Sequence, residues 1–405
     1  MHVIYLEWPL ARNAGGPAGY LWHLRQGLSR MRPSPPIKFI APSNSPPPGW
    51  GKGGLLKRAI DSLTQTKHLW RFLKSYGPTT LRRSYRDLVG TAIEQLFFAS
   101  DVEQTLSDED VSSLHCHTTM DAVRADNSLR RMGRRDQVKL YLTSHCPEMP
   151  AIELTEILVA AGLRPQLAHN AFDQLLKIDL HAFRAADVIV FPCQESMEPY
   201  FETCDLFGNA IAGKKLCHVL TGIEDVPPTQ DIIPGEFHEL FKIAYVGRHN
   251  SVKGYDLLLE ALPPFLDRTG AVLFVAGRQG PFFAPCHTRW RELGWIPTPS
   301  ALIKGCDIFL LPNRRTYFDL VAIEAMAMGR AILASSTGGN KALAALTPGV
   351  TLFSPNEECL SAALEHIASC GREELHRRGQ ANRAVYESTL TADAFADRYV
   401  RMLES

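Results

Sequence analysis

The sequence lacks the features that mark several classes of protein. Lysine plus arginine (43) balances aspartate plus glutamate (43), so the overall charge does not indicate nucleic-acid binding. Nine cysteines are present but none form a C-x-x-C pair, which favours reduced thiols over disulfides or a metal cluster. No run of about 18 uncharged apolar residues predicts a membrane span. The first residues lack a basic stretch followed by a long apolar one, so we expect no signal peptide and a cytoplasmic location.

What is present indicates two α/β domains. The chain of 405 residues is too long for one ordinary core. Strand-like runs, most of them continuously apolar, alternate with amphipathic helical segments, as is typical of parallel strands buried on both faces. We expect helices at 17–31, 255–266, 320–328 and 357–369. We expect strands at 3–6, 37–41, 112–117, 138–143, 188–192, 242–246, 272–276, 307–311, 331–334 and 350–353.

A turn-rich stretch at 222–234 separates two blocks of strand, helix and strand. Each block predicts a doubly wound, Rossmann-like domain. We expect an N-terminal domain at 1–225, a C-terminal domain at 226–388, and a final helix at 389–405 that packs back on the N-terminal domain.

Residues 50–90 form a basic segment in which nine lysines and arginines face only two aspartates, with apolar side chains interleaved. A basic amphipathic helix there could lie on an anionic membrane surface. The alternative is a solvated helix that covers the N-terminal domain.

Two segments of the second half contain the candidate ligand-binding residues. Gly247, Arg248 and Lys253 follow a buried strand and precede a helix, where open α/β sheets bind ligands. Two cations at one turn suit a diphosphate, although a solvated basic turn would look the same. Further on, a strand leads through a loop to a helix that begins near residue 319. Glu324 lies in its second turn, where it could accept ribose hydroxyls or merely complement the helix dipole.

Together these segments resemble the retaining GT-B glycosyltransferases of family 4. That family has the pattern strand–Gly-Arg–x4–Lys-Gly, a second strand that ends in glycine, and an E-x7-E loop and helix continued by Ala-Met-Ala. Most of residues 240–345 match in order and spacing. The matching residues are Gly247-Arg248, Lys253-Gly254, Gly277, Glu324-Ala325-Met326-Ala327 and Gly338-Gly339.

The resemblance implies a GT-B fold, in which two Rossmann-like domains face each other across a cleft. It implies transfer of a sugar, with retention, from a nucleotide-diphosphate sugar to an acceptor hydroxyl, without a metal or other cofactor. Arg248 and Lys253 would hold the diphosphate and act in catalysis, and Glu324 would hold the ribose. The amides of Leu320 and Val321 would bind the distal phosphate.

One position departs from the family pattern. Thr316 stands where the first acid of E-x7-E would contact the donor sugar. A threonine can still form a hydrogen bond to a sugar, but it has no charge and a shorter reach. Asp319 could compensate, although its place at the helix start also suits capping or the helix dipole.

The first half holds weaker signals. Gly15 and Gly16 follow the first strand and resemble the family's glycine-rich loop, although a plain strand-to-helix turn is the alternative. By the same resemblance His117 is the preferred catalytic histidine beside the reacting sugar, and His145 is the second candidate, on the acceptor or sugar side. His115 and His117 would share one strand face, but no third ligand accompanies them, so we expect no metal site.

Alternative functions remain open. The chain could be a degenerate GT-B protein that binds nucleotide or sugar without catalysis, or a GT-B phosphorylase or epimerase. The expected partners are a nucleotide-sugar donor and a sugar-containing or lipid-linked acceptor, with peripheral contact at the inner membrane face through residues 50–90 as one possibility. The sequence does not indicate which sugar is transferred.

Overall fold

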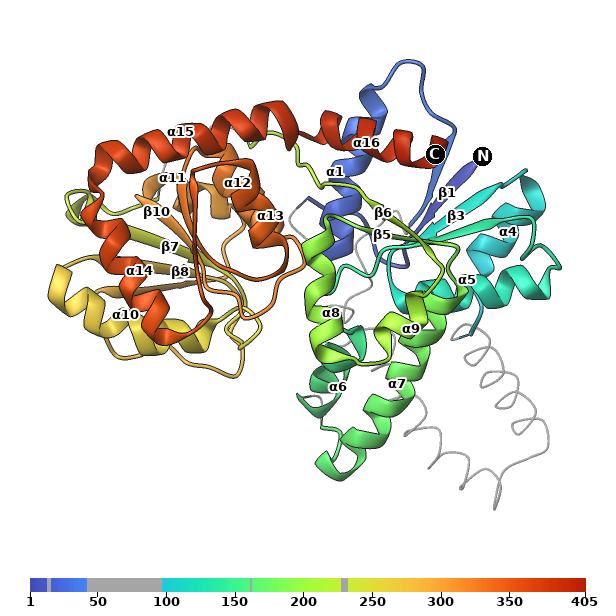
Figure 1. Cartoon of the computed structure of the whole chain (residues 1–405), viewed down its shortest axis with the longest axis horizontal. Coiled ribbons are helices and arrows are strands. Elements are labelled where there is room, and N and C mark those ends of the chain that lie inside the picture. The colour runs from blue at the N-terminus through green and yellow to red at the C-terminus, as the bar shows by residue number, and fades with distance from the viewer. Residues whose placement is uncertain (13–15, 42–96, 161, 227–231) are drawn as a thin grey trace, which may run out of the picture.

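The computed structural model describes residues 1–12, 16–41, 97–160, 162–226 and 232–405. Two sheets form the centres of two domains that lie side by side (Figure 1). Within the described residues each sheet has six strands, all parallel. The prediction of two doubly wound α/β domains is therefore confirmed.

The N-terminal sheet has the strand order β2-β1-β3-β4-β5-β6. Its strands are β1 (His2–Tyr5), β2 (Ile37–Ile40), β3 (Ser113–Cys116), β4 (Lys139–Leu142), β5 (Val188–Phe191) and β6 (Lys215–His218). Its helices are α1 (Gly16–Arg30), α4 (Ser100–Asp108), α5 (Thr119–Arg131), α6 (Pro150–Ala160), α7 (Pro165–Ala185), α8 (Glu198–Thr203) and α9 (Phe207–Ile211), with a 3₁₀ turn at Gln194–Met197.

The C-terminal sheet has the strand order β12-β11-β10-β7-β8-β9. Its strands are β7 (Lys242–Val246), β8 (Val272–Ala276), β9 (Trp290–Gly294), β10 (Ile308–Leu311), β11 (Ala331–Ser335) and β12 (Val350–Phe353). Its helices are α10 (Tyr255–Thr269), α11 (Pro299–Gly305), α12 (Leu320–Ala327), α13 (Gly338–Leu346), α14 (Glu357–Ser369) and α15 (Gly371–Thr389), after a 3₁₀ turn at Gly235–Phe237.

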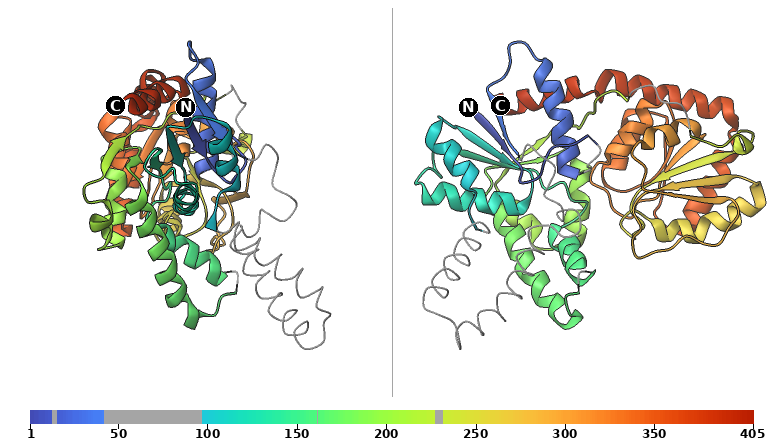
Figure 2. Two further views of the ribbon diagram at one scale, coloured as in Figure 1. Left: turned by 90° about the vertical axis from the view of Figure 1, so that its right-hand side faces the viewer. Right: turned by 180° about the vertical axis from the view of Figure 1, so that it is seen from behind.

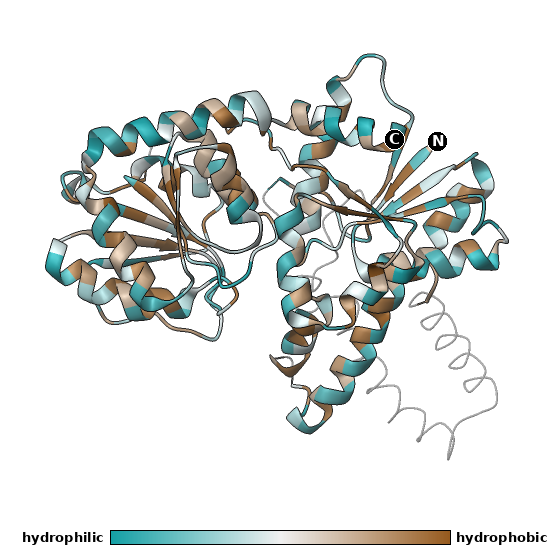
Figure 3. Ribbon diagram, in the orientation of Figure 1, coloured by the Kyte–Doolittle hydropathy of each residue, from teal (hydrophilic) through white to brown (hydrophobic). Residues whose placement is uncertain are grey.

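The central strands are the apolar part of each domain. Strands β5, β8, β10 and β11 are buried along their whole length, and Figure 3 shows brown strands inside with mainly teal helices outside. Burial on both faces explains why these strands carry continuous rather than alternating apolar runs.

The ten predicted strands are all present, but two edge strands were not predicted. Most residues of β6 and β9 are exposed, so neither segment carries the apolar run by which the other strands were recognised. An edge strand pairs on one side only and is not obliged to be apolar.

The chain crosses between the domains twice, and the two crossings are bonded to each other. The first crossing follows β6. At the second, α15 leads into α16 (Ala392–Glu404), which lies on the N-terminal domain, as the red helices of Figure 1 and the right-hand view of Figure 2 show. The Ile223 amide donates to the Leu390 carbonyl (2.9 Å), and the Ala392 amide donates to the Ile223 carbonyl (2.8 Å).

Helix α16 shares a core with α1 and the N-terminal sheet. Phe395, Ala396 and Tyr399 are buried there against Tyr20, Leu21 and Leu24 of α1. The Tyr399 hydroxyl also bonds to His2 Nε2 (2.9 Å) and to His115 Nδ1 (2.7 Å), so this buried aromatic side chain has its polar end satisfied.

Two sequence predictions fall outside the described residues. The basic segment at 50–90 lies within the undescribed stretch 42–96, and Gly15 lies within 13–15. In the part of the chain that the structure describes, no helix combines the length and the apolar character needed to cross a membrane.

Gly27 tests the contact between α1 and α16. A Cβ atom at Gly27 would lie 2.2 Å from the Ala392 carbonyl oxygen and 2.8 Å from the Ala396 Cβ. We therefore expect Gly27→Ala to lower the free energy of unfolding by about 1–3 kcal/mol through overpacking, as measured by chemical denaturation.

The matched control is Gly208→Ala in α9. A Cβ there meets only Phe201, at an ordinary 3.5 Å, and alanine is the better helix former, so this variant should be as stable as the parent or slightly more stable. Equal stability of Gly27→Ala and the parent would show that the two helices do not pack this closely.

Candidate functional site

The loops that follow β7 and β10 meet at the carboxyl edge of the C-terminal sheet. Gly254 has a positive φ of 67°, and a Cβ there would lie 1.8 Å from the Pro312 carbonyl oxygen. Only glycine allows this approach without a backbone shift. The Arg314 amide then donates to the Val252 carbonyl (3.0 Å), which fixes the two loops against each other.

The start of α1 lies against the start of α12. A Cβ at Gly19 would lie 3.2 Å from Leu320 Cδ1. Gly16, with a φ of 49°, opens α1 on the same side. The contact brings the first turns of α1 near the helix start that carries Leu320 and Val321.

The two predicted diphosphate cations lie in this region, and each is bonded to a carboxylate. Lys253 Nζ donates to Asp319 Oδ1 (2.6 Å) and Oδ2 (2.7 Å). Arg248 donates to Glu153 Oε1 (2.6 Å), which comes from α6 of the other domain. Gly247, directly before Arg248, has little room for a side chain, because a Cβ atom there would lie 2.7 Å from the Tyr245 hydroxyl oxygen.

Asp319 is the N-cap residue of α12, but its side chain makes no capping hydrogen bond. The carboxylate instead accepts from Lys253 and from Asn313 Nδ2 (2.9 Å). Of the roles that the sequence left open for Asp319, the structure therefore excludes side-chain capping, because the lysine of the neighbouring loop holds the carboxylate instead. The first amides of α12 keep no capping bond from this residue.

Glu324 lies in the second turn of α12 and is half-buried. Burial raises the pKa of its carboxyl group to about 7, and the positive charge of Arg12 opposes this effect. The group therefore changes charge near neutral pH, where it could accept hydrogen bonds from hydroxyl groups once ionised.

The two candidate histidines are bonded to each other. His117 Nδ1 and His145 Nε2 are 2.9 Å apart, and the Tyr20 ring packs edge-on against His145 at 4.5 Å. Burial lowers the pKa of His145 to about 3 and that of His117 well below its usual range, so both rings are neutral at pH 7.

The two histidines differ in how far they are buried. His117 is fully buried, whereas His145 is only partly buried and its ring centre lies 6.0 Å from that of Tyr317 in the other domain. His145 also has a φ of 59°, an uncommon conformation for a non-glycine residue that recurs at functional sites. His145 is thus the more accessible of the two rings and the one that lies beside the C-terminal domain.

Tyr317, in the loop after β10, packs against the N-terminal domain. Its hydroxyl donates to the Val190 carbonyl (3.3 Å), and its own carbonyl accepts from Ser196 Oγ (2.5 Å). Its ring lies 5.7 Å from that of Phe191. Sequence patterns gave no sign of this contact, because Tyr317 looks like any aromatic residue of a loop.

Thr316 precedes this anchor and is fully buried. Its hydroxyl has no hydrogen-bond partner among the residues that the structure describes. The position is tight, since a Cβ at Gly338 would lie 2.0 Å from the Thr316 carbonyl oxygen. The side chain that replaces the expected acid is therefore packed away rather than presented to solvent.

Histidines 115 and 117 share a strand face, with ring centres 4.2 Å apart, as the H-x-H spacing predicted. His115 is occupied by hydrogen bonds to Tyr399 (2.7 Å) and to Thr143 (2.9 Å). Across the described ranges, no group of three or more histidine, cysteine, aspartate or glutamate side chains could hold a metal ion.

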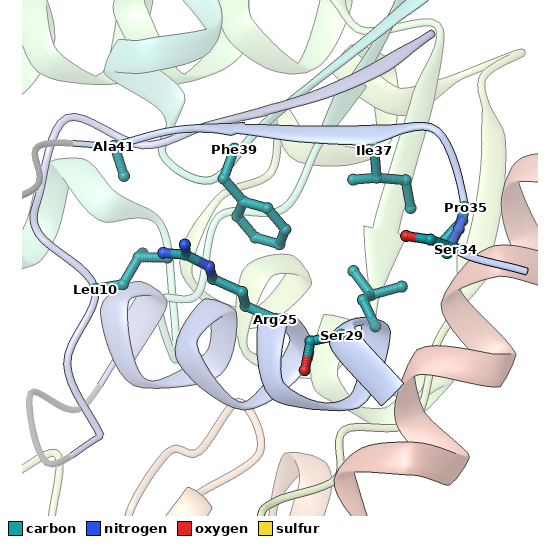
Figure 4. A pocket seen from close by; sticks show the side chains of 9 residues that line it. Leu10, Arg25, Ser29, Ser34, Pro35, Ile37, Phe39 and Ala41 are labelled. Atoms are coloured by element: carbon teal, nitrogen blue, oxygen red, sulfur yellow. The ribbon is translucent and has the colours of Figure 1, made fainter. Parts of the chain in front are cut away.

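A separate groove lies away from these residues, between α1 and β2 (Figure 4). The Arg25 guanidinium lies 5.9 Å from the ring centre of Phe39, one of its apolar walls. The groove contains none of the predicted site residues. Its lining residues are Leu10, Arg25, Leu28, Ser29, Ser34, Pro35, Ile37, Phe39 and Ala41.

Comparisons with known proteins connect the C-terminal domain to a family. Residues 241–370 match the family model described as Glycosyl transferases group 1. The chain is 27% identical over 187 residues to a glycogen synthase of Myxococcus xanthus, covering 44% of this chain and 35% of that protein. It is 31% identical over 143 residues to a D-inositol 3-phosphate glycosyltransferase of Corynebacterium aurimucosum, covering 31% of this chain and 34% of that protein. These alignments span about a third of the relatives' length.

Solved structures resemble the whole chain in fold. Sucrose-phosphate synthase from Thermosynechococcus elongatus gives a TM-score of 0.63 at 14% identity, covering 100% of this chain and 98% of that one. The Anabaena protein HepE in complex with UDP and glucose gives 0.59 at 13% identity, with 100% and 99% covered. At this identity the likeness shows the fold.

Thr316→Val tests the buried hydroxyl. Removing an unpartnered hydroxyl while keeping the side-chain shape should raise the free energy of unfolding by about 1–2 kcal/mol, as measured by chemical denaturation. The control is Thr347→Val, because the Thr347 hydroxyl bonds to Asn382 (3.0 Å) and accepts from the Gly349 amide (3.0 Å). That variant should be less stable than the parent. A loss of stability in Thr316→Val would mean that its hydroxyl has a partner.

Proposed function

We propose that the chain is a retaining glycosyltransferase, because residues 241–370 match the family model described as Glycosyl transferases group 1 and the whole chain resembles a sucrose-phosphate synthase in fold. It would move a sugar from a nucleotide-diphosphate sugar to an acceptor hydroxyl. The proposal includes a cytoplasmic location and an acceptor that contains a sugar or is linked to a lipid.

One observation carries the proposal. The two cations Arg248 and Lys253 lie at the same sheet edge as the start of α12 and the half-buried carboxyl group of Glu324. Cations and free helix amides suit the phosphates of a donor, and a carboxylate one turn further along suits ribose hydroxyls. The position of this set in an open α/β sheet, beyond the carboxyl ends of the strands, is where such folds bind ligands.

The catalytic role of these residues would be electrostatic. When the bond between sugar and phosphate breaks, negative charge grows on the departing diphosphate. Arg248, Lys253 and the amides of Leu320 and Val321 would stabilise that charge without a metal ion. The departing phosphate would accept the proton of the attacking hydroxyl on the same face of the sugar. His145, held neutral by burial and by its bond to His117, would act as a hydrogen-bonding partner beside the sugar.

The solved neighbour HepE carries UDP and glucose, which supports UDP-sugars as the first donors to test. A thermal-shift panel of UDP, GDP, ADP and their sugars would select the nucleotide, because a ligand that binds only the folded state raises the melting temperature. Release of free nucleoside diphosphate that depends on an added acceptor then separates transfer from epimerisation or phosphorolysis. Binding without any release would favour the non-catalytic alternative.

Lys253→Ala tests the donor site. Loss of one cation should reduce turnover with the selected nucleotide sugar by an amount equivalent to about 2–4 kcal/mol at the transition state. Turnover is measured with excess EDTA present, which should not inhibit the parent. Lys177→Ala, at an exposed lysine of α7, should leave turnover unchanged. Full activity of Lys253→Ala would remove this lysine from the mechanism, and inhibition by EDTA would contradict metal independence.

Glu324 gives the proposed nucleotide site a pH dependence. With a pKa of about 7, its carboxyl group is mostly neutral at pH 6 and mostly ionised at pH 8. Only the ionised form accepts both ribose hydroxyls, so the Kd of UDP should fall by up to about tenfold between these pH values. Calorimetric titration at both pH values checks this. Glu324→Gln should bind UDP more weakly, and only the titration of the nucleotide's own phosphate should remain. An identical pH response in parent and variant would exclude Glu324.

A further inference from the structure

The lysine of the proposed donor site is neutralised within its own domain. The carboxylate of Asp319 accepts two bonds from Lys253 Nζ, at 2.6 and 2.7 Å, and a third from Asn313 Nδ2 at 2.9 Å. The pair is largely buried, with side-chain exposures of 21% for Lys253 and 16% for Asp319. The carboxylate also lies at the N-terminus of α12, where a phosphate group would otherwise find a favourable field.

The arginine is neutralised from the other domain. Arg248 donates to Glu153 Oε1 at 2.6 Å, and this pair is more open, with side-chain exposures of 47% and 28%. A second ion pair also joins a carboxylate of the N-terminal domain to a cation of a C-terminal loop: Arg315 donates to Glu148 at 2.5 Å. The carboxylates of this segment therefore reach across to the cations of the C-terminal loops.

The local charges cancel as a result. The charges of the two cations are balanced by those of two carboxylates. The site therefore attracts an incoming diphosphate only weakly until one of the carboxylates separates from its cation. The two pairs differ in how easily they separate. An exposed single pair contributes only about 0.2–1 kcal/mol, whereas the carboxylate of Asp319 is held by a second donor and is shielded from water.

We propose that Glu153 and Asp319 are internal counter-ions that a donor diphosphate displaces, and that they set the affinity of the site for its nucleotide. The inference rests on the proposed function, because it assumes that the diphosphate binds at Arg248 and Lys253. Glu153 leaves first, since its pair is the more exposed one. Because Glu153 belongs to the N-terminal domain, its release also weakens a contact between the domains, and the two events are thermodynamically linked.

The inference is tested by calorimetric titration of the full chain with UDP, GDP and ADP. Removing the charge of Glu153 with Glu153→Gln should tighten nucleoside diphosphate binding about two- to fivefold, the range that corresponds to an exposed ion pair. Asp319→Asn should tighten binding at least as much, because it frees Lys253 from a more buried partner.

The matched control is Glu198→Gln. Glu198 pairs with Lys341 across the same two domains at 2.6 Å, with comparable exposures of 39% and 37%, but neither residue belongs to the proposed donor site. This variant should bind nucleoside diphosphate as the parent does.

Two results would overturn the counter-ion inference alone. One is a parent chain that binds a nucleoside diphosphate while Glu153→Gln binds it equally or more weakly. The other is equal tightening in Glu153→Gln and Glu198→Gln, which would assign the effect to loss of any contact between the domains. If neither the parent nor any variant binds any of the three nucleotides, the proposed donor site is itself wrong, and the inference falls with it.

Discussion

The candidate site depends on one contact, the insertion of Tyr317 into the N-terminal domain. Parallel sheets place the carboxyl ends of all their strands at one edge, so each domain alone presents a row of loops there. Tyr317 joins the two rows: its ring packs beside Phe191 and its backbone carbonyl accepts from Ser196. Beside Tyr317 in the sequence, Thr316 is buried, and Asp319 lies at the start of α12, where it is bonded to Lys253.

Much of the fold could be predicted because burial leaves a pattern in the sequence. Strands covered on both faces, such as β8 and β10, must be continuously apolar, and that run is visible without a structure. Edge strands carry no such requirement. Only Trp290 of β9 is buried, so its sequence, Trp-Arg-Glu-Leu-Gly, does not differ from that of an exposed loop.

The residues of the site could be predicted only where they lie close together in the sequence or follow a recognisable strand and loop. Arg248 and Lys253 are five residues apart on one turn, and Glu324 follows a recognisable strand and loop. The partners of these residues were not predictable, since Glu153 is 95 positions from Arg248 and carries no motif. The relation of the two histidines was equally hidden. His145 lies beside Tyr317 of the other domain and has a positive φ, which the residues around it in the sequence do not predict.

The doubled crossing between the domains has a mechanical consequence. The segments at Ile223 and Thr391 form a parallel bridge, and Ile223 bonds to the residues on both sides of Thr391. Gly222 lies so near Thr391 that a Cβ would be 2.2 Å from its carbonyl oxygen. A movement of the domains that slides one of these segments past the other would break both hydrogen bonds. The chain therefore passes between the domains through one bonded pair of segments rather than through two separate linkers.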